Sequence, residues 1–481
     1  MRPFKLSKNI FSHLRLSKNI LFYNFSSDFF KNLHLNPYLF ANLKENKISE
    51  PTSIQVKVCL EHVINGENAV VTAETGSGKT LCYLLPVMNH ILSKKLDLAP
   101  EVYRQNSPRG AIILVPTKEL GAQVYAMIRR LDKKNKLDVS RTGSIGYIAP
   151  ISDDKQPKDA RTSLRLNDLA FESVVRGIDW DQLDILVSTP SQLDQMLKLK
   201  DQTNPYQVDP KFIVIDEFDL LLGDTNIARS TISILNRFCN VHNNPQNINR
   251  QFILTGASFP LRINNEKGTQ FIDKVFKRPI CIESENFYKI SEKMKHVVIR
   301  VNDYLNANPN FSIQDILVDQ IKKSTSQRII VFVQSQASSE SIAKHLQDHD
   351  IKALSFHANL NTEQRIDTLA NFDEGKVRVL VSTDLASRGL DFQNVDHVIQ
   401  FDFALDAVSF LHRVGRTCRM GRNGVVTSFV RENDEFLYEK VQKLICNHQR
   451  IDPIISRKRS LSKNYKRSKG SDDEMSSDDD N

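Results

Sequence analysis

The residues with the clearest chemical capacity lie in the segment AETGSGKT at positions 73–80. Gly76 and Gly78 allow backbone N–H groups to turn towards phosphate oxygens, and a helix that starts here adds the positive end of its dipole. Lys79 can reach the outer phosphates of a nucleoside triphosphate, and the Thr80 hydroxyl can bind Mg²⁺. A strand-like apolar run precedes the segment and a helical pattern follows it, as this chemistry requires. The residues that we expect to contact nucleotide here are Thr75, Gly76, Ser77, Gly78, Lys79 and Thr80.

A pair of acids, Asp216 and Glu217, follows the apolar run 211–215. Ligands of open α/β sheets bind at the carboxyl ends of the strands. We expect Asp216 to hold Mg²⁺ through water, and Glu217 to orient and deprotonate the water that attacks the phosphate. Taken alone, acids after a strand more often form a solvated turn. Behind a phosphate-binding loop, the catalytic interpretation is favoured.

Short apolar runs rich in branched residues alternate with helical patterns along the chain. This alternation predicts an α/β fold of two tandem domains with parallel sheets, because strands buried on both faces are continuously apolar. We expect a first domain at residues 28–285 with a polar insertion at 146–180, a linker at 286–296 and a second domain at 297–450. The predicted strands are 69–73, 111–115, 184–188, 211–215, 251–255, 329–333, 377–382, 397–401 and 425–430.

Composition excludes several classes of protein. Apolar residues make up 40% of the chain and charged residues 25%, which are globular values. The six cysteines form no CxxC pair and no close cluster with histidine, which argues against a disulfide framework or a structural zinc site. No apolar run is long enough to span a bilayer, so we expect no membrane partner.

The basic excess, a net charge of +8, is concentrated at the chain ends. Residues 1–27 hold five basic residues and no acid, which is typical of a mitochondrial presequence; the alternative is a disordered basic arm that touches RNA. The tail, residues 451–481, is basic and then acidic, and we expect it to be disordered. Its basic part also fits a nuclear-localisation signal.

With these elements the chain resembles the DEAD-box RNA helicases over about residues 28–450, which implies two RecA-like domains. EPTSIQ at 50–55 is similar to the Q motif of that family, and the resemblance implies that Gln55 hydrogen-bonds the adenine edge. Phe30 lies at the spacing of the aromatic residue that stacks on the base. The alternative is that Phe30 anchors the first helix in the core.

Two further segments of the first domain resemble family motifs that grip RNA phosphates. PTKEL at 116–120 is similar to PTREL, and TPSQL at 189–193 is similar to TPGRL, with Gln192 in place of arginine. The lost arginine implies a weaker grip on RNA. The RNA-contacting residues implied by the resemblance are Pro116, Thr117, Lys118, Thr189 and Pro190, together with Thr383 of the second domain.

Two departures from the family pattern concern the link between ATP chemistry and strand separation. GAS at 256–258 stands where the family has SAT, so Gly256 lacks a hydroxyl that links the acidic motif to domain closure. Phe218 replaces the alanine of the DEAD motif. We expect ATP chemistry to survive these changes more surely than tight coupling to strand separation.

In the second domain, STDLASRGLD at 382–391 resembles motif V and HRVGRTCR at 412–419 resembles motif VI. The residues that motif V would place near the nucleotide are Asp384, Gly389 and Asp391. Motif VI implies that Arg416 and Arg419 act as arginine fingers on the transferring phosphate. The expected catalytic set is Lys79, Asp216, Glu217, Arg416 and Arg419, and the expected Mg²⁺ ligands are Thr80 and Asp216.

The sequence thus predicts an enzyme that uses ATP and Mg²⁺, binds RNA and remodels short duplexes as a monomer. One ATP is expected between the domains, since only the first has a phosphate-binding loop. The leader predicts the mitochondrial matrix, with ribosomal RNA and large-subunit assembly proteins as partners, as in the similar divergent fungal mitochondrial DEAD-box helicases. The alternatives are a nuclear or nucleolar helicase, an ATP-gated RNA clamp that hardly unwinds, and a DNA-directed helicase of the same superfamily.

Overall fold

The computed structural model describes residues 15–16, 30, 35–56, 66–99, 102, 110–139, 183–203, 209–223, 225–239, 250–260, 262–263, 266–277, 279–387, 390, 392, 395–419 and 422–451. They belong to two compact units, and apart from residues 74–76 the chain divides between Glu285 and Asn286. The predicted insertion, all of the predicted tail except Ile451, and all of the predicted leader except two residues lie outside the described residues. Among the described helices, none combines the length and the apolar character needed to cross a membrane.

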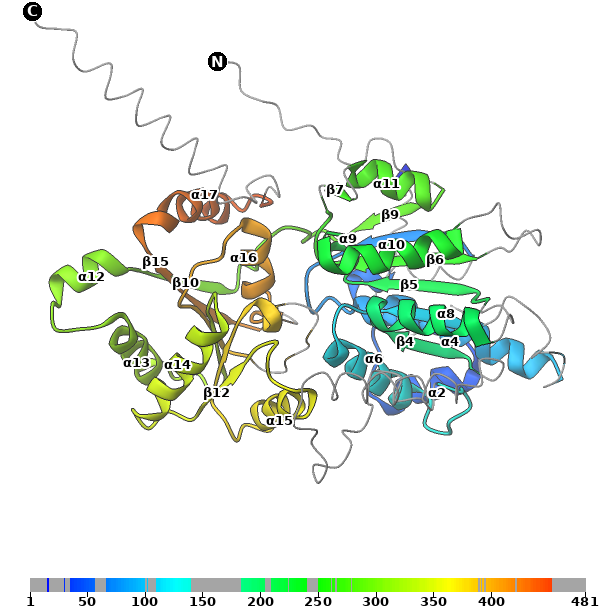
Figure 1. Cartoon of the computed structure of the whole chain (residues 1–481), viewed down its shortest axis with the longest axis horizontal. Coiled ribbons are helices and arrows are strands. Elements are labelled where there is room, and N and C mark those ends of the chain that lie inside the picture. The colour runs from blue at the N-terminus through cyan, green and yellow to red at the C-terminus, as the bar shows by residue number, and fades with distance from the viewer. Residues whose placement is uncertain are drawn as a thin grey trace, which may run out of the picture. The chain divides into compact units, whose positions relative to one another are not determined.

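The first unit is built on a sheet of seven parallel strands (Figure 1). Their order is β1 (Arg15–Leu16), β9 (Ile280–Glu283), β2 (Ala69–Thr72), β6 (Gln251–Gly256), β5 (Phe212–Asp216), β3 (Ala111–Leu114) and β4 (Ile185–Ser188). The five predicted strands of this region are present, and the sequence missed β9 and β1 at one edge. Because β1 lies within residues 1–27, the sheet extends into the predicted leader, whose role in import stays a prediction.

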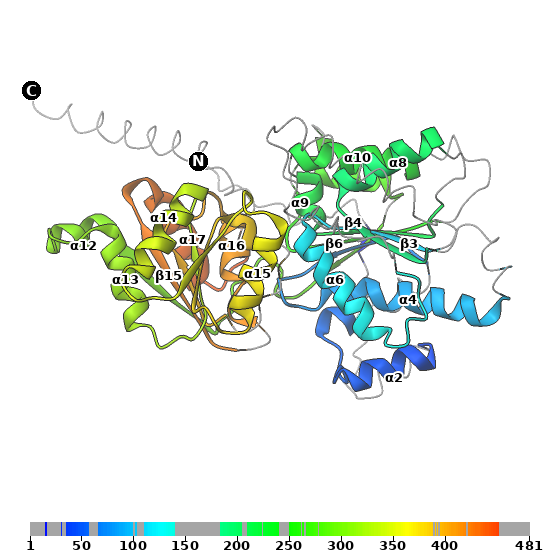
Figure 2. The same ribbon diagram turned by 60° about the horizontal axis from the view of Figure 1, so that its bottom comes forward.

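Alternate residues of β9, β2, β6, β5, β3 and β4 enter two separate cores in the first unit. In β2, Val71 faces one core and Val70 the other. Figure 2 shows the helices of each core on opposite faces of the sheet. One face carries α2 (Pro37–Glu45), α4 (Lys79–Asp97) and α6 (Lys118–Leu131); the other carries α8 (Pro190–Thr203), α9 (Phe218–Gly223), α10 (Thr225–Cys239) and α11 (Gly268–Val275), beside the short pair β7 (Arg262–Ile263) and β8 (Glu266–Lys267). Strands covered on both faces must be apolar throughout, which is why the continuous apolar runs predicted them.

The second unit repeats this plan with six parallel strands. Their order is β10 (Met294–Arg300), β15 (Gly424–Val430), β14 (His397–Gln400), β11 (Ile329–Phe332), β13 (Val379–Ser382) and β12 (Ala353–Phe356). In β11, Ile329 and Val331 face one core, while Ile330 and Phe332 face the other. The core that contains Ile329 includes α12 (Val301–Ala307), α13 (Ile313–Lys323) and α14 (Gln336–Gln347). The core that contains Ile330 includes α15 (Thr362–Asp373), the 3-10 turn η4 (Asp384–Ser387), α16 (Ala407–Val414) and α17 (Glu435–Cys446). A second 3-10 turn, η6 (Glu432–Asp434), directly precedes α17. The two units together confirm the predicted fold class.

The predicted linker at 286–296 needs a correction at its end. Met294 begins β10, which pairs along its length with β15 and so belongs to the second sheet. Phe287 and Tyr288 are also buried, and the Tyr288 carbonyl accepts a hydrogen bond from the Ile451 N–H. The polar composition misled the prediction because β10 is an edge strand and several of its side chains are partly exposed.

Candidate functional site

The loop between β2 and α4 has the backbone that the glycine spacing predicts. Gly76 and Gly78 adopt φ angles of 80° and 89°, a region that favours glycine. The Lys79 ammonium turns back over the loop and donates a hydrogen bond to the Ala73 carbonyl at 2.8 Å. Thr80 follows in the first turn of α4. The loop therefore presents backbone donors, an ammonium group and a hydroxyl at the carboxyl end of β2.

Gln55 braces this loop. Its Nε2 donates to the Gly78 carbonyl at 3.0 Å, while its Oε1 accepts the N–H of Thr52 at 2.9 Å. A Cβ on Gly78 would lie 2.5 Å from the same Nε2, so the glycine is needed for this approach as well as for its φ angle. Contact with adenine stays a prediction for Gln55, and the bracing role is one that the sequence did not indicate.

Phe30 lies in the hydrophobic core of the first unit. Its side chain is 1% exposed and belongs to the same core as Leu39 and Leu43 of α2. A ring buried to this extent leaves no face for a base to stack on. The position in the core is that of the alternative interpretation, an anchor for the first helix, and the structure gives no support to stacking on adenine.

Asp216, the last residue of β5, is held by three donors. Its carboxylate accepts hydrogen bonds from the hydroxyls of Tyr83 at 2.8 Å and Thr255 at 2.6 Å, and from the Glu217 N–H at 3.0 Å. Burial raises the pKa of Asp216, while these hydrogen bonds and the charge of Lys79 oppose the rise. The sequence missed Tyr83 and Thr255, which are distant in the chain.

The donor set at the end of β5 fits Mg²⁺ through a bound water. Asp216 and Thr80 offer the oxygen ligands that Mg²⁺ prefers. A carboxylate has about four lone-pair positions. Three of them accept the hydrogen bonds described above, so one remains for a metal-bound water. A bound Mg²⁺ would supply charge neutralisation at the phosphates, and Asp216 would orient its water.

Glu217 occupies a left-handed backbone conformation with a φ angle of 53°. A non-glycine residue in this region carries strain of about 1–3 kcal/mol, which is found most often at functional sites. The Glu217 carbonyl accepts the N–H groups of Leu220 and Leu221, so the residue also starts α9. This turn at the strand end sets the direction of the Glu217 side chain, as an activating base requires.

Asp219 links the acidic motif to the end of β6. Its carboxylate accepts hydrogen bonds from the Ser258 N–H at 2.9 Å and from the Ser258 hydroxyl at 2.5 Å. The one hydroxyl that the GAS triplet retains, that of Ser258, therefore bonds the acidic motif.

The two departures at Phe218 and Gly256 form one packing feature. A Cβ on Gly256 would lie 2.8 Å from the Phe218 ring, closer than real Cβ contacts. The ring is fully buried and packs edge-on against Phe259. A phenylalanine in the acidic motif thus requires glycine at the end of the neighbouring strand.

The predicted RNA segments of the first unit follow the adjacent parallel strands β3 and β4. Thr117 caps α6, where its hydroxyl accepts the Leu120 N–H at 3.2 Å. The Thr189 hydroxyl donates a hydrogen bond to the side-chain oxygen of Gln192 at 3.1 Å. The glutamine that stands in place of the family's arginine therefore fixes the position of the Thr189 side chain. Lys118 and Pro116 are partly exposed, whereas Pro190 is buried and supports the start of α8.

In the second unit, Asp384 pairs with Arg413. The carboxylate accepts a hydrogen bond from Arg413 Nε at 2.6 Å, and Arg413 also donates to the Asp402 carbonyl at 2.6 Å. The guanidinium carbon lies 5.2 Å from the centre of the Phe332 ring, and the side chain is fully buried. Asp384 therefore has a structural partner within its own unit, one that the sequence did not predict. Thr383 precedes it directly after β13 and is partly exposed.

The two predicted arginine fingers are anchored to backbone carbonyls of their own unit. Arg416 donates from Nε to the His412 carbonyl at 3.2 Å and from Nη1 to the Leu390 carbonyl. Arg419 donates from Nε to the Gly415 carbonyl at 2.9 Å. Their role on a phosphate stays a prediction. The motif V residues Gly389 and Asp391 lie outside the described residues.

Comparison with known proteins agrees with this geometry. A family model of DEAD/DEAH box helicases matches residues 52–266, and a model of the helicase conserved C-terminal domain matches residues 312–421. The chain belongs to the DEAD-box RNA helicase family. Relatives of this DEAD-box chain include DEAD-box ATP-dependent RNA helicase 39 of Arabidopsis thaliana, 27% identical over 89% of the chain, and ATP-dependent RNA helicase SrmB of Escherichia coli, 26% identical over 86% of it.

The DEAD-box chain spans only part of several relatives. It covers 62% of the Arabidopsis protein and 53% of a Dictyostelium discoideum relative, the probable ATP-dependent RNA helicase ddx3, but 82% of SrmB. Among solved structures, S. cerevisiae Dbp5 bound to RNA and ADP BeF3 matches with a TM-score of 0.65 at 22% identity over 86% of this chain and 93% of that one. Mss116p bound to ssRNA and AMP-PNP matches with a TM-score of 0.68 at 19% identity over 89% and 78%. These structures share the fold of the two RecA-like domains.

Proposed function

We propose that this chain is an ATP-dependent RNA helicase whose ATPase activity is stimulated by RNA. The observation that carries the proposal is the arrangement at one edge of the first sheet. The phosphate-binding loop follows the carboxyl end of β2, and Asp216 and Glu217 lie at the carboxyl end of β5. Strand β6 lies between β2 and β5. Family membership and the names of the relatives, which are ATP-dependent RNA helicases, support the same activity.

In this proposal the loop binds the phosphates of ATP, and Mg²⁺ is oriented by Asp216 and Thr80. Glu217 activates the attacking water, while Arg416 and Arg419 of the second domain stabilise the developing charge. Thr117, Lys118 and Thr189, with Thr383, would contact the RNA backbone and give little sequence preference. Coupling between ATP and RNA binding would follow from domain closure, by reciprocal linkage.

The test is ATP hydrolysis by the purified full chain with and without RNA. We expect RNA to raise the rate and single-stranded DNA to raise it much less. A chain stimulated equally by DNA would support the DNA-directed alternative. A Lys79→Ala variant should bind ATP weakly and hydrolyse it slowly, because the ammonium group that meets the outer phosphates is lost. Hydrolysis at the parent rate by that variant would exclude the proposed site.

A second candidate function is an ATP-gated RNA clamp that hardly separates strands. Gly256 has no hydroxyl and the Phe218 ring fills the space beside it, so within the GAS triplet the acidic motif is bonded through Ser258. Gln192 holds Thr189 and brings no charge to the RNA. Duplex-separation and RNA-retention assays decide between the two. Robust ATPase with retained RNA and no strand release favours the clamp.

For the cellular role, we propose the mitochondrial matrix and assembly of the large ribosomal subunit, with ribosomal RNA and assembly proteins as partners of a monomer. The support is the basic, acid-free composition of residues 1–27. A fusion of residues 1–30 to a fluorescent reporter tests the location. Nuclear or nucleolar signal without mitochondrial signal would overturn the organelle assignment. RNA crosslinking in the located compartment then tests the ribosomal RNA.

A further inference from the structure

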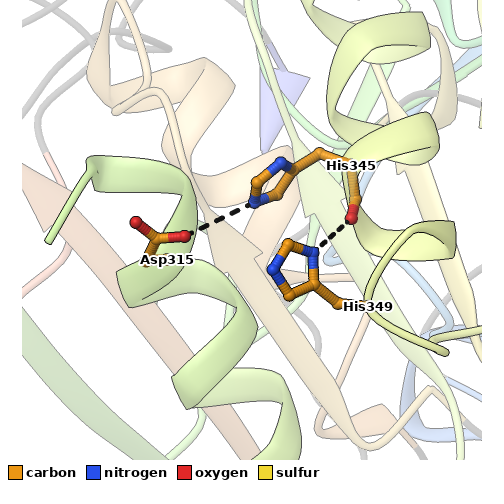
Figure 3. Close-up of side chains that lie close together, drawn as sticks. All are labelled: Asp315, His345 and His349. Carbon is orange, nitrogen blue, oxygen red and sulfur yellow. Dashed lines mark hydrogen bonds and ion pairs between the residues drawn. The ribbon is translucent and has the colours of Figure 1, made fainter.

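Two histidines and an aspartate from two neighbouring helices lie together in the second unit (Figure 3). Asp315 stands in the first turn of α13, His345 in the last turn of α14, and His349 in the turn just after α14. One possible ligand atom from each residue lies within 4.8 Å of the others. All three side chains are partly exposed, so an ion from solvent can reach them.

The two imidazoles are arranged as metal ligands are. His349 Nδ1 lies 2.8 Å from the His345 carbonyl, which can only accept, so Nδ1 carries the hydrogen and Nε2 keeps its lone pair. Metal-binding histidines commonly donate their other ring N–H in this way. His345 Nε2 has no hydrogen-bond partner and points at Asp315 Oδ1 at 3.7 Å, too far for a hydrogen bond (Figure 3).

Asp315 is positioned independently of the histidines. Its Oδ2 accepts hydrogen bonds from the Ser312 N–H at 2.8 Å and the Ser312 hydroxyl at 2.6 Å, as part of the capping box of α13. These bonds hold the carboxylate in place and lower the pKa of Asp315. Its other oxygen, Oδ1, is the one directed at His345. The anion is therefore fixed by its own helix and faces the imidazoles.

We propose that Asp315, His345 and His349 bind a divalent transition-metal ion, with Zn²⁺ as the ion they fit best. Zn²⁺ commonly takes imidazole nitrogens and one carboxylate, with water in the fourth position of a tetrahedron. Ligand atoms at about 2.0–2.1 Å from a tetrahedral ion are about 3.4 Å apart. The 3.7 Å between His345 Nε2 and Asp315 Oδ1 needs little adjustment, and the ligand atom of His349, which lies within 4.8 Å of the other two, would move closer. Mg²⁺ and Ca²⁺ prefer oxygen ligands throughout and should bind poorly here.

The consequence is a cross-link between α13 and α14 on one face of the second sheet. A simple ion pair between protonated His345 and Asp315 is the competing explanation. That ion pair involves only His345 and Asp315, and it does not explain why the ring of His349 lies beside them. The two explanations differ in what each variant does to metal binding, and neither depends on whether the chain hydrolyses ATP.

The experiment is a titration of the untagged, nucleotide-free full chain with Zn²⁺ by calorimetry and with Co²⁺ by visible absorption. We expect the parent to bind one ion more than the double variant His345→Ala/His349→Ala, and to gain thermal stability that the double variant does not gain. Asp315→Asn keeps an oxygen for the Ser312 N–H, and it should bind Zn²⁺ at least about tenfold more weakly because the anionic ligand is lost.

His448→Ala is the matched control. His448 Nδ1 lies 3.8 Å from Glu292 Oε1, a histidine–carboxylate pair like that of His345, and it belongs to no cluster of three possible ligands among the described residues. This variant should bind as many ions as the parent. If the double variant binds the same number of ions with the same affinity as the parent, or if Asp315→Asn binds unchanged, the proposal is overturned.

Discussion

The carboxyl ends of the strands carry different chemistry in the two units. In the first unit they present carboxylates, at Asp216, Glu217 and Asp219, beside the ammonium group of Lys79. In the second unit Asp384, the acidic residue of motif V that the structure describes, follows β13 and pairs with the guanidinium group of Arg413. The same parallel-sheet plan thus carries an acid-rich, metal-suited edge in one copy and a carboxylate paired with arginine in the other.

The two edges also differ in how their charges are satisfied. Asp216 is held by neutral hydroxyl and N–H donors, which orient it and leave its charge to act on a metal-bound water. Arg413 is neutralised by a carboxylate and packed on an aromatic ring, so its charge serves the fold. Asp216 is thus available to act on a ligand, whereas Arg413 stabilises its own domain. Variants of the two sites can test this distinction.

The largest expected effect is on catalysis in the first unit. Glu217→Gln removes the base while it keeps the size of the side chain, and kcat for ATP hydrolysis should fall by about 10²–10⁴ with nucleotide binding retained. Steady-state kinetics and a fluorescent-nucleotide titration measure the two quantities. The surface variant Glu45→Gln, at a residue paired with Lys133, should match the parent. If Glu217→Gln hydrolyses ATP at a rate within a fewfold of the parent, Glu217 is not the catalytic base and the first unit's acidic edge has no catalytic role through this residue.

The next effect is on folding of the second unit. Arg413→Ala breaks a buried ion pair, loses the bond to the Asp402 carbonyl and leaves a cavity beside Phe332. Breaking a buried pair costs about 3–5 kcal/mol, and we expect the lower part of this range because Asp384 is about one third exposed. Hydrogen exchange should show loss of protection in β11 and β14 with β3 unchanged. Full protection in the variant would show that Arg413 has no structural role.

Acid should weaken the second unit through His397. Burial, with a smaller contribution from Arg378, lowers the pKa of this imidazole from 6.5 to about 4, while its nitrogens meet the Ser324 and Thr427 hydroxyls. Between these pH values the unfolded chain binds the proton and the folded chain does not, so stability falls as pH decreases from 6.5 to about 4. The loss should reach about 3 kcal/mol, since one pKa unit is worth about 1.4 kcal/mol.

Hydrogen exchange at several pH values measures this loss in each unit separately. His90 of the first unit also has its pKa lowered to about 4 by burial, so both units should lose protection in acid. His397→Gln should reduce the loss in the second unit alone. A pH profile unchanged by this variant would contradict the assignment to His397.

The sequence predicted what is local and missed what depends on packing between distant segments. The phosphate-binding loop and the central strands were predictable because their glycines and apolar runs are contiguous. The partners of Asp216 were not, because Tyr83 lies in α4 and Thr255 in β6. The edge strands β10 and β12 were missed because several of their side chains are partly exposed, so they are not uniformly apolar and buried.

Two side-chain groups illustrate the same limit. Phe30 had two interpretations from spacing alone, and only the core around it decides between a stacking ring and an anchor. His345 and His349 are four residues apart in the sequence, but two histidines without a third ligand do not indicate a metal site. Asp315 becomes their neighbour only because α13 packs beside α14.

The smallest effect concerns the packing that joins β6 to the acidic motif in the first unit. Gly256→Ala adds a Cβ that would lie 2.8 Å from the Phe218 ring, and overpacking of this kind costs about 1–3 kcal/mol. The same change should cost less in a Phe218→Ala background, with a coupling free energy of about 1–2 kcal/mol in a double-mutant cycle from denaturant unfolding. Gly223→Ala is the control, because its Cβ would meet only Pro260 at an ordinary 3.8 Å. If Gly256→Ala costs the same in both backgrounds, the two departures from the family pattern are independent, and the ring is not what excludes a side chain at position 256.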